Sequence, residues 1–210
     1  MNAPLSVAPA RHHDDLFAEV ARVCAERMAN DMADRLRGMF EALRADAELD
    51  ALTGLFNRRR LDRCLPQELA ESRRAGAALV LALIDVDHFG RINKEYGWPS
   101  GDRVLAEVAR RLRDSIRSND WVARYGGDEF CVILRAVTLD EACAILGRVR
   151  ATIGDEPIAI TGDATCQVTV SIGVAELAIG NDRNALLERT SELLLAAKRF
   201  GRDQLRAQAN

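Results

Sequence analysis

The sequence predicts an α+β protein with a ferredoxin-like fold: an antiparallel-centred sheet flanked by helices, expected on one of its faces, after an N-terminal helical stalk. Residues 78–84 form a continuous apolar run, which is typical of a strand buried on both faces. A Gly-Gly pair at 126–127 separates two short apolar segments, which predicts a tight turn between paired strands. Around these features, the patterns follow the order β-α-β-β-α-β of ferredoxin-like folds.

The first expected element is a helix over residues 14–48, where apolar residues recur every three or four positions between charged ones. One helix cannot bury such a stripe alone. Two interpretations remain: the helix folds back onto the domain, or it pairs with a second chain as a dimerisation and signalling stalk. We favour the stalk, because long helices without caps usually pair. Residues 1–13 are expected to be a disordered tail, and residues 49–206 the main domain.

The elements of the main domain follow from periodicity and from turn residues. They are a helix over 58–74 ended by Gly76, a strand over 78–84, a helix over 101–116, strands over 121–125 and 130–134, a helix over 139–153, a strand over 167–174 and a helix over 184–200. Polymerase palms and nucleotide cyclases share this palm-type arrangement, although a fold alone does not define a function.

The composition excludes several classes of protein. A formal net charge of -3 gives no basic excess for binding nucleic acid. The longest apolar run is too short to span a membrane, and the N-terminus lacks the pattern of a secretory signal. Five scattered cysteines without a Cys-x-x-Cys pair suit reduced thiols, so we expect a cytoplasmic protein without a zinc site or disulfides.

Two carboxylates stand where the buried apolar strand ends. Asp85 and Asp87 are two residues apart and so point to the same side of a strand. Hard oxygen ligands at a strand end suit Mg²⁺ together with substrate phosphates. The alternative is that a carboxylate caps the following helix. We favour the cap for Asp87 and the metal for Asp85.

The Gly-Gly turn is followed directly by Asp128 and Glu129. Two glycines allow a ligand to approach the backbone closely. If this hairpin pairs with the strand that ends at Asp85, three carboxylates converge in the outline of a two-metal phosphoryl-transfer site. Further along the chain, Lys198 and Arg202 are four residues apart, a spacing that predicts one shared helix face. They either neutralise a helix C-terminus or clamp a phosphate.

Four separated motifs resemble the GGDEF family of diguanylate cyclases, over residues 50–205. Residues 124–130 read Arg-Tyr-Gly-Gly-Asp-Glu-Phe, and residues 50–59 match the family's upstream Asp-x-Leu-Thr-Gly-Leu-x-Asn-Arg-Arg. Residues 85–89 match Asp-x-Asp-x-Phe, and residues 198–202 match Lys-Arg-x-Gly-Arg. The resemblance implies that two GTP molecules are condensed into cyclic di-3′,5′-GMP with release of two pyrophosphates. Because one domain holds one GTP, it also implies a homodimer whose active faces meet across a two-fold axis.

The resemblance also implies roles for single residues. Mg²⁺, or Mn²⁺ in its place, would be held by Asp85, the Val86 carbonyl and Asp128, with Glu129 in support. Asp128 would also accept the proton of the 3′-hydroxyl, so Asp128 and Glu129 are the implied catalytic residues. The implied substrate-binding residues are Asn93 and Asp102 at guanine, Lys198 and Arg202 at phosphate, and Phe89, Gly126 and Gly127 around them.

A second site is implied just before the hairpin. Residues 117–120 match the family's Arg-x-x-Asp motif, at which cyclic di-GMP inhibits the enzyme. Arg117 and Asp120 would bind the product together with Arg148. Arginine suits this task because it pairs with phosphate and stacks on guanine.

Three positions depart from the family pattern. Gly90, Lys94 and Trp98 stand where the family commonly has Lys, an acid and His. They put nucleotide affinity and turnover in question, but they leave the metal and base residues intact. The leading hypothesis is therefore an active, product-inhibited cyclase, with a sensor or regulatory protein acting through the N-terminal helix. The alternatives are a non-catalytic cyclic di-GMP receptor and a module that binds GTP without cyclising it.

Overall fold

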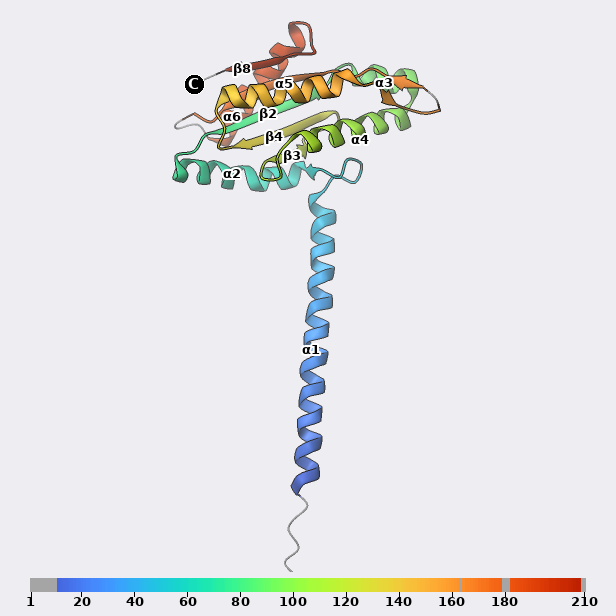
Figure 1. Ribbon diagram of the computed structural model, residues 1–210, viewed down its shortest axis with the longest axis vertical. Coiled ribbons are helices and arrows are strands. Elements are labelled where there is room, and N and C mark those ends of the chain that lie inside the picture. The colour runs from blue at the N-terminus through green and yellow to red at the C-terminus, as the bar shows by residue number, and fades with distance from the viewer. Residues whose placement is uncertain (1–10, 163, 179–181, 209–210) are drawn as a thin grey trace, which may run out of the picture. The chain divides into compact units, whose positions relative to one another are not determined.

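The computed structural model describes residues 11–162, 164–178 and 182–208, in two compact units, Met1–Ala47 and Glu48–Asn210 (Figure 1). The helix α1 spans Arg11–Glu48 and so begins three residues earlier than expected, while the rest of the predicted tail lies outside the described residues. Large apolar side chains of α1 are exposed, including Val20, Met28 and Met32. Within residues 11–162, 164–178 and 182–208, no helix combines the length and the apolar character that a membrane span requires.

The second unit is built on a six-stranded sheet in the order β1-β3-β4-β2-β7-β8. The strands are β1 (Phe56–Asn57), β2 (Leu79–Val86), β3 (Trp121–Arg124), β4 (Glu129–Arg135), β7 (Val170–Glu176) and β8 (Leu205–Gln208). The four central strands pair antiparallel, and the edge strands β1 and β8 pair parallel to their neighbours. A separate two-stranded ribbon pairs β5 (Ile158–Ala159) with β6 (Thr165–Cys166). The predicted α+β architecture with an antiparallel centre is therefore confirmed.

Helices cover both faces of the sheet, so the expectation of a single covered face was wrong. The helices of this unit are α2 (Arg58–Ala75), α3 (Phe89–Tyr96), α4 (Trp98–Ser115), α5 (Leu139–Asp155) and α6 (Arg183–Arg199). The even-numbered residues of β2, such as Val80 and Ile84, pack in the core cluster that contains α4 and α5. The odd-numbered ones, such as Leu81, pack in the cluster that contains α2 and α6. All eight residues of β2 are buried, as its apolar run predicted.

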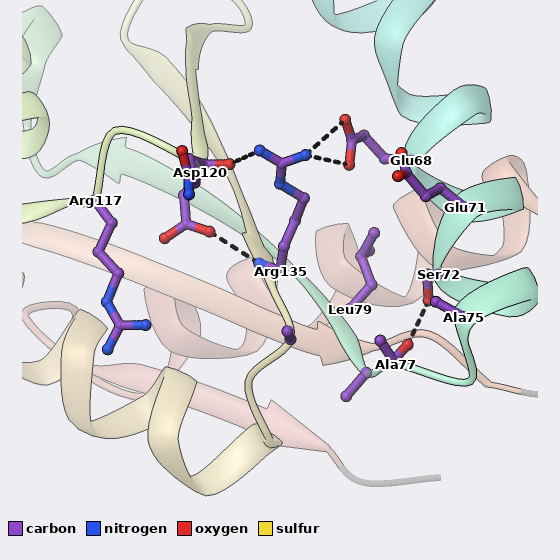
Figure 2. Close-up of a pocket in the computed structure, with 12 residues that line it drawn as sticks. Glu68, Glu71, Ser72, Ala75, Ala77, Leu79, Arg117, Asp120 and Arg135 are labelled. Carbon is purple, nitrogen blue, oxygen red and sulfur yellow. Dashed lines mark hydrogen bonds and ion pairs between the residues drawn. The ribbon is translucent and has the colours of Figure 1, made fainter.

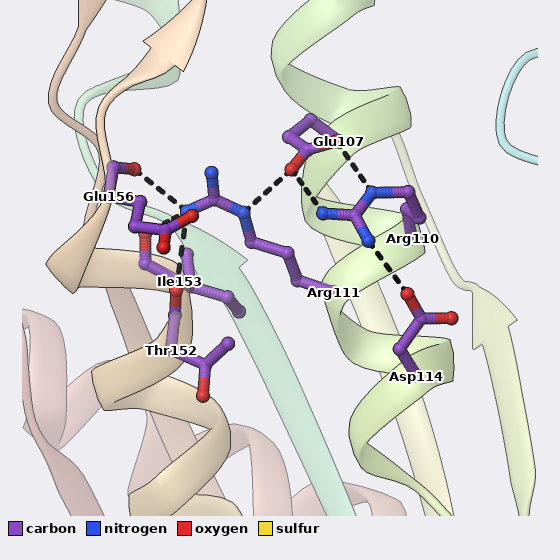
Figure 3. Close-up of polar contacts among 7 residues, drawn as sticks. All are labelled: Glu107, Arg110, Arg111, Asp114, Thr152, Ile153 and Glu156. Carbon is purple, nitrogen blue, oxygen red and sulfur yellow. Dashed lines mark hydrogen bonds and ion pairs between the residues drawn. The ribbon is translucent and has the colours of Figure 1, made fainter.

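Helices α4 and α5 are joined by a buried arginine (Figure 3). Arg111 on α4 donates to the carbonyls of Thr152, Ile153 and Glu156 at 3.2, 3.0 and 2.8 Å, and to Glu107 at 2.8 Å. These carbonyls lie at the C-terminal end of α5, where backbone acceptors lack helical partners and positive charge is favourable. The contacts of Arg110 and Arg111 lower the pKa of Glu107 to about 2. This junction fixes the two helices that carry Asp102 and Arg148.

A candidate nucleotidyl-transfer site at the end of β2

The predicted hairpin lies directly beside the strand that ends at Asp85. In the antiparallel pair of β2 and β4, Asp85 stands opposite Glu129, and the Val86 amide donates to the Asp128 carbonyl at 3.2 Å. The turn between β3 and β4 closes with the amides of Tyr125 and Gly126 donating to the Glu129 carbonyl at 2.8 and 3.2 Å. The sheet therefore brings the two acidic motifs to one place.

Asp85 is a buried carboxylate in an acidic surrounding. Lys198 from α6 lies 2.6 Å from its Oδ2 and forms an ion pair with it. Burial raises the pKa of Asp85 to about 6; Lys198 opposes this rise, and the negative charges of Asp128 and Glu129 add to it. The cluster is thus short of positive charge in the absence of a ligand. Carboxylates with this deficit, beside the Val86 carbonyl, fit a hard divalent cation that prefers oxygen ligands.

The side chains of these carboxylates do not converge as expected. Within residues 11–162, 164–178 and 182–208, no group of three or more acidic, histidine or cysteine side chains is gathered so that it could hold a metal ion. Asp85 is turned to Lys198. Glu129 lies over the turn, as shown by the 3.0 Å between its Oε2 and the position that a Cβ on Gly126 would occupy. The backbone placement of the three residues is as predicted, whereas their metal-binding role remains a prediction.

The turn is also braced from the upstream motif, a contact that the sequence did not reveal. Arg124 donates to the Gly127 carbonyl at 2.7 and 3.1 Å and pairs with Asp50 at 3.1 Å. Asp50 in turn accepts from the amide and the hydroxyl of Thr53 at 2.9 and 2.7 Å. The first motif therefore holds the shape of the hairpin.

The predicted guanine-binding residues lie on two consecutive helices. Asn93 is on α3, and its Oδ1 is buried without a hydrogen-bond partner among the described residues. An unsatisfied buried acceptor costs about 1–3 kcal/mol, so a ligand that donates to it would be favoured. Its amide sits against Gly101 of α4, where a Cβ would be 1.9 Å from Oδ1 and 3.1 Å from Phe89 Cζ. Asp102 follows directly and is exposed.

The predicted cations do not share a helix face. Lys198 is in the last turn of α6, but the helix ends at Arg199, and Arg202 has a φ of 62°. The spacing argument was wrong because Gly201, Arg202 and Asp203 all have positive φ, which ends the helix. Non-glycine residues in this region cost about 1–2 kcal/mol each. Arg202 is exposed, and its amide donates to the Ala197 carbonyl at 3.0 Å.

Asp87 is not a helix cap, so that interpretation was also wrong. The N-cap of α3 is His88, with a φ of 58° and no capping side-chain bond. Asp87 instead accepts from the hydroxyls of Ser171 and Thr169 at 2.7 and 2.8 Å and from the Asp203 amide at 3.0 Å. It therefore joins β2, β7 and the segment that carries Arg202.

The family comparison agrees with this geometry. The family model described as "Diguanylate cyclase, GGDEF domain" matches residues 47–204. The chain belongs to this family. It is 41% identical over 165 residues to the diguanylate cyclase DgcP of Pseudomonas aeruginosa, covering 79% of this chain and 24% of that protein. The chain thus spans about a quarter of the length of DgcP, and less than half of the other first curated relatives.

Solved structures of GGDEF proteins also resemble the chain. The coiled coil and GGDEF domain of DgcB from Caulobacter crescentus, in complex with c-di-GMP, aligns with a TM-score of 0.82 and 31% identity, covering 92% of this chain and 99% of that one. The diguanylate cyclase SiaD of Pseudomonas aeruginosa, in complex with its activator SiaC, aligns with a TM-score of 0.77 and 36% identity, covering 94% and 75%.

The residues predicted for the second site of this GGDEF domain do not all line one hollow. A pocket of about 580 Å³ between α2 and the sheet is lined by Arg117 and Asp120 (Figure 2). Arg148 lines a different hollow of about 260 Å³, which also includes Arg117. Arg117 is thus common to both, while Asp120 and Arg148 belong to separate ones.

Two residues that the sequence did not single out complete the larger pocket. The backbone amide of Arg135 donates to Asp120 Oδ1 at 2.9 Å. The guanidinium of Arg135 donates to the Asn119 carbonyl and pairs with Glu68 at 3.4 Å (Figure 2). Glu68 is buried and also accepts from Trp121 Nε1 at 2.9 Å. These contacts fix the orientation of Asp120 at the pocket wall.

The three departures from the family pattern lie around α3 and the start of α4. Gly90 is exposed in the first turn of α3, Lys94 is exposed in its last turn, and Trp98 begins α4 with 75% of its surface exposed. They lie on the helices that carry Asn93 and Asp102, and the predicted acidic residues of the site are unchanged.

Proposed function

We propose that the chain is a diguanylate cyclase that condenses two GTP molecules into cyclic di-3′,5′-GMP and releases two pyrophosphates. The observation that carries the proposal is the strand-end cluster, in which Asp85, ion-paired with Lys198, stands opposite Glu129 next to Asp128. Family membership and the similarity to DgcP support the same activity. The carboxylates can bind the metal ion of a metal–triphosphate complex, and the neighbouring lysine can bind its phosphate oxygens.

In this proposal, each 3′-oxygen attacks the α-phosphorus of the other GTP, and the bond to pyrophosphate breaks. Asp128 accepts the proton of the hydroxyl, and Glu129 supports it. When bound, Mg²⁺ (or Mn²⁺ in its place), held by Asp85, the Val86 carbonyl and these carboxylates, supplies neutralisation of the phosphate charge. Lys198 and Arg202 bind phosphate oxygens.

Guanine selectivity would come from the junction of α3 and α4. The buried Oδ1 of Asn93 and the exposed Asp102 carboxylate offer partners for the Watson–Crick edge of guanine. A carboxylate facing two N–H groups discriminates against adenine, because a wrong base leaves it unpaired. Phe89, Gly126 and Gly127 would line the remaining approach to the nucleotide.

We further propose that the active form is a homodimer paired through α1. One domain holds one GTP, so the two reacting nucleotides must be brought together by two chains. The exposed apolar side chains of α1 support pairing, as does the similarity to the coiled-coil form of DgcB. A regulatory partner is consistent with the structure of SiaD with its activator. Deletion of residues 1–45 should lower both the oligomer mass and the cyclase rate; unchanged values would remove the role of α1.

Product inhibition is proposed at the pocket of Arg117 and Asp120, with Arg148 reaching the ligand from α5. Its support is that Arg117 and Asp120 line one pocket of about 580 Å³, in which the Arg135 amide fixes the Asp120 carboxylate. Cyclic di-GMP should inhibit the wild-type chain, and Arg117→Ala should lose that inhibition at unchanged basal turnover.

A second candidate is a receptor that binds cyclic di-GMP without making it. Gly90 and Trp98 favour it, because both lie near the predicted nucleotide and neither offers a cation. The test is incubation of the full chain with GTP and Mg²⁺, with wild type compared with Asp128→Ala and with Asp114→Ala, an exposed control whose carboxylate pairs on its own helix. If the chain is a cyclase, the wild type and Asp114→Ala should make cyclic di-GMP and Asp128→Ala should not. A receptor predicts no product but binding of added cyclic di-GMP.

A further inference from the structure

The segment after α6 has an unusual backbone and a dense set of anchors. Gly201, Arg202 and Asp203 have φ values of 118°, 62° and 43°, and two of these residues are not glycines. Such conformations persist where surrounding contacts fix them, and they cluster at functional sites. The contacts that fix this segment are therefore evidence for its function.

The first anchor is Asp87, which is 4% exposed. Its Oδ2 accepts from the Asp203 amide at 3.0 Å and from Thr169 Oγ1 at 2.8 Å, and its Oδ1 accepts from Ser171 Oγ at 2.7 Å. A carboxylate that accepts three such bonds is held in one orientation. Asp87 therefore ties the segment to the same strand end that carries Asp85.

The second anchor comes from another helix. Arg150 of α5 donates from Nη1 to the Asp203 carbonyl at 2.9 Å and to Asp203 Oδ1 at 2.5 Å. Asp203 is thus held at its amide by one charged residue and at its carbonyl and carboxylate by another. Arg202 lies immediately before it and projects from a backbone that both anchors restrict.

We propose that Asp87 and Arg150 are positioning residues that hold Arg202 where it binds the β- and γ-phosphates of GTP; this rests on the proposed function, and it adds two residues outside the substrate contacts. Lys198 is fixed against Asp85 by their ion pair at 2.6 Å. Asp87, two residues after Asp85 in the chain, fixes the segment that carries Arg202. The two cations are therefore set against one strand end, although no helix face joins them.

The test measures equilibrium binding of 3′-deoxy-GTP and 3′-deoxy-GMP to the full chain with Mg²⁺, since neither has the hydroxyl that reacts. Arg150→Ala should raise the dissociation constant for the triphosphate about tenfold, within the range of couplings between neighbouring residues, and leave that for the monophosphate nearly unchanged. Arg150→Lys should recover part of the loss. Arg110→Ala is the matched control, because Arg110 pairs with Glu107 and Asp114 on its own helix.

The double variant Arg150→Ala/Arg202→Ala should bind the triphosphate no more weakly than Arg202→Ala alone, because the anchor acts through that arginine. Asp87→Asn, which cannot accept all three bonds, should reproduce the selective loss if it folds. Normal triphosphate binding by Arg150→Ala, with weakened binding by Arg202→Ala, would overturn the inference and leave the proposed function standing. Equal losses for both ligands would also overturn it. Unchanged binding by Arg202→Ala would remove the phosphate role itself, and the inference with it.

Discussion

Gly101 provides a sharp test of the predicted guanine site. It lies inside α4, and a Cβ at this position would be 1.9 Å from Asn93 Oδ1 and 2.9 Å from its Cγ. The two nearest obstructing atoms belong to the end of a flexible side chain, so Gly101→Ala should move the Asn93 amide rather than unfold the helix. Alanine in place of glycine within a helix contributes about 1 kcal/mol, which offsets part of the strain.

The loss should therefore fall on GTP binding. One hydrogen bond left unmade to guanine costs about 1–3 kcal/mol, which raises KM for GTP about 5- to 160-fold. The assay is steady-state turnover of Gly101→Ala, with thermal unfolding measured beside it. Gly147→Ala is the control, because no atom lies within 4 Å of the added Cβ. An unchanged KM, even with a maximal rate lowered by loss of folded protein, would refute the placement of guanine at Asn93.

Three further predictions concern stability. Gly173→Ala should cost about 3 kcal/mol, because its Cβ would meet backbone atoms of α6 at 2.3 Å, whereas Gly147→Ala should be neutral or stabilising in urea unfolding. Arg111→Ala should cost about 2–3 kcal/mol by leaving buried carbonyls unpaired, while Arg110→Ala, which removes an exposed side chain, should leave the free energy of unfolding nearly unchanged in the same assay. The pKa of Asp85 is raised to about 6, so between pH 4.5 and 6 the folded state keeps a proton that the unfolded state has released. The free energy of unfolding of the metal-free wild type should therefore fall by about 2 kcal/mol, relative to that of Asp85→Asn, as the pH rises from 4.5 to 7.5. A constant difference across that range would contradict the last prediction.

Much of the fold could be predicted from local patterns. The apolar run of β2 and the Gly-Gly turn marked the central antiparallel strands, and Gly76 marked the end of α2 with a φ of 61°. The short edge strands β1 and β8 were not predicted, because two and four residues are too few to show an alternation. The bounds of helix α3 were not predicted, because its N-cap residue is His88, which makes no capping bond, and not Asp87. The apolar run of β2 predicted a strand buried on both sides, which requires helices on both faces of the sheet. The expectation of helices on one face did not take this into account.

The candidate site could be predicted only in part, for a related reason. Asp85, Asp128 and Glu129 stand at strand ends and turns, which sequence patterns reveal. The partners of Asp87 are 82, 84 and 116 residues away along the chain, so no local spacing announces them. Helical spacing failed for Arg202 because Gly201 ends the regular backbone before it, and this glycine was the available signal. The contacts of Arg135 with Asp120 likewise depend on strand pairing.

The most direct measurement is the stoichiometry of the reaction catalysed by the full chain with GTP and Mg²⁺. Cyclic di-GMP and pyrophosphate are quantified together as GTP is consumed. We predict two pyrophosphates for each cyclic di-GMP, with no product from Asp128→Ala. Consumption of GTP without cyclic di-GMP, or equal product from Asp128→Ala, would contradict the assignment of the strand-end cluster as a cyclase site.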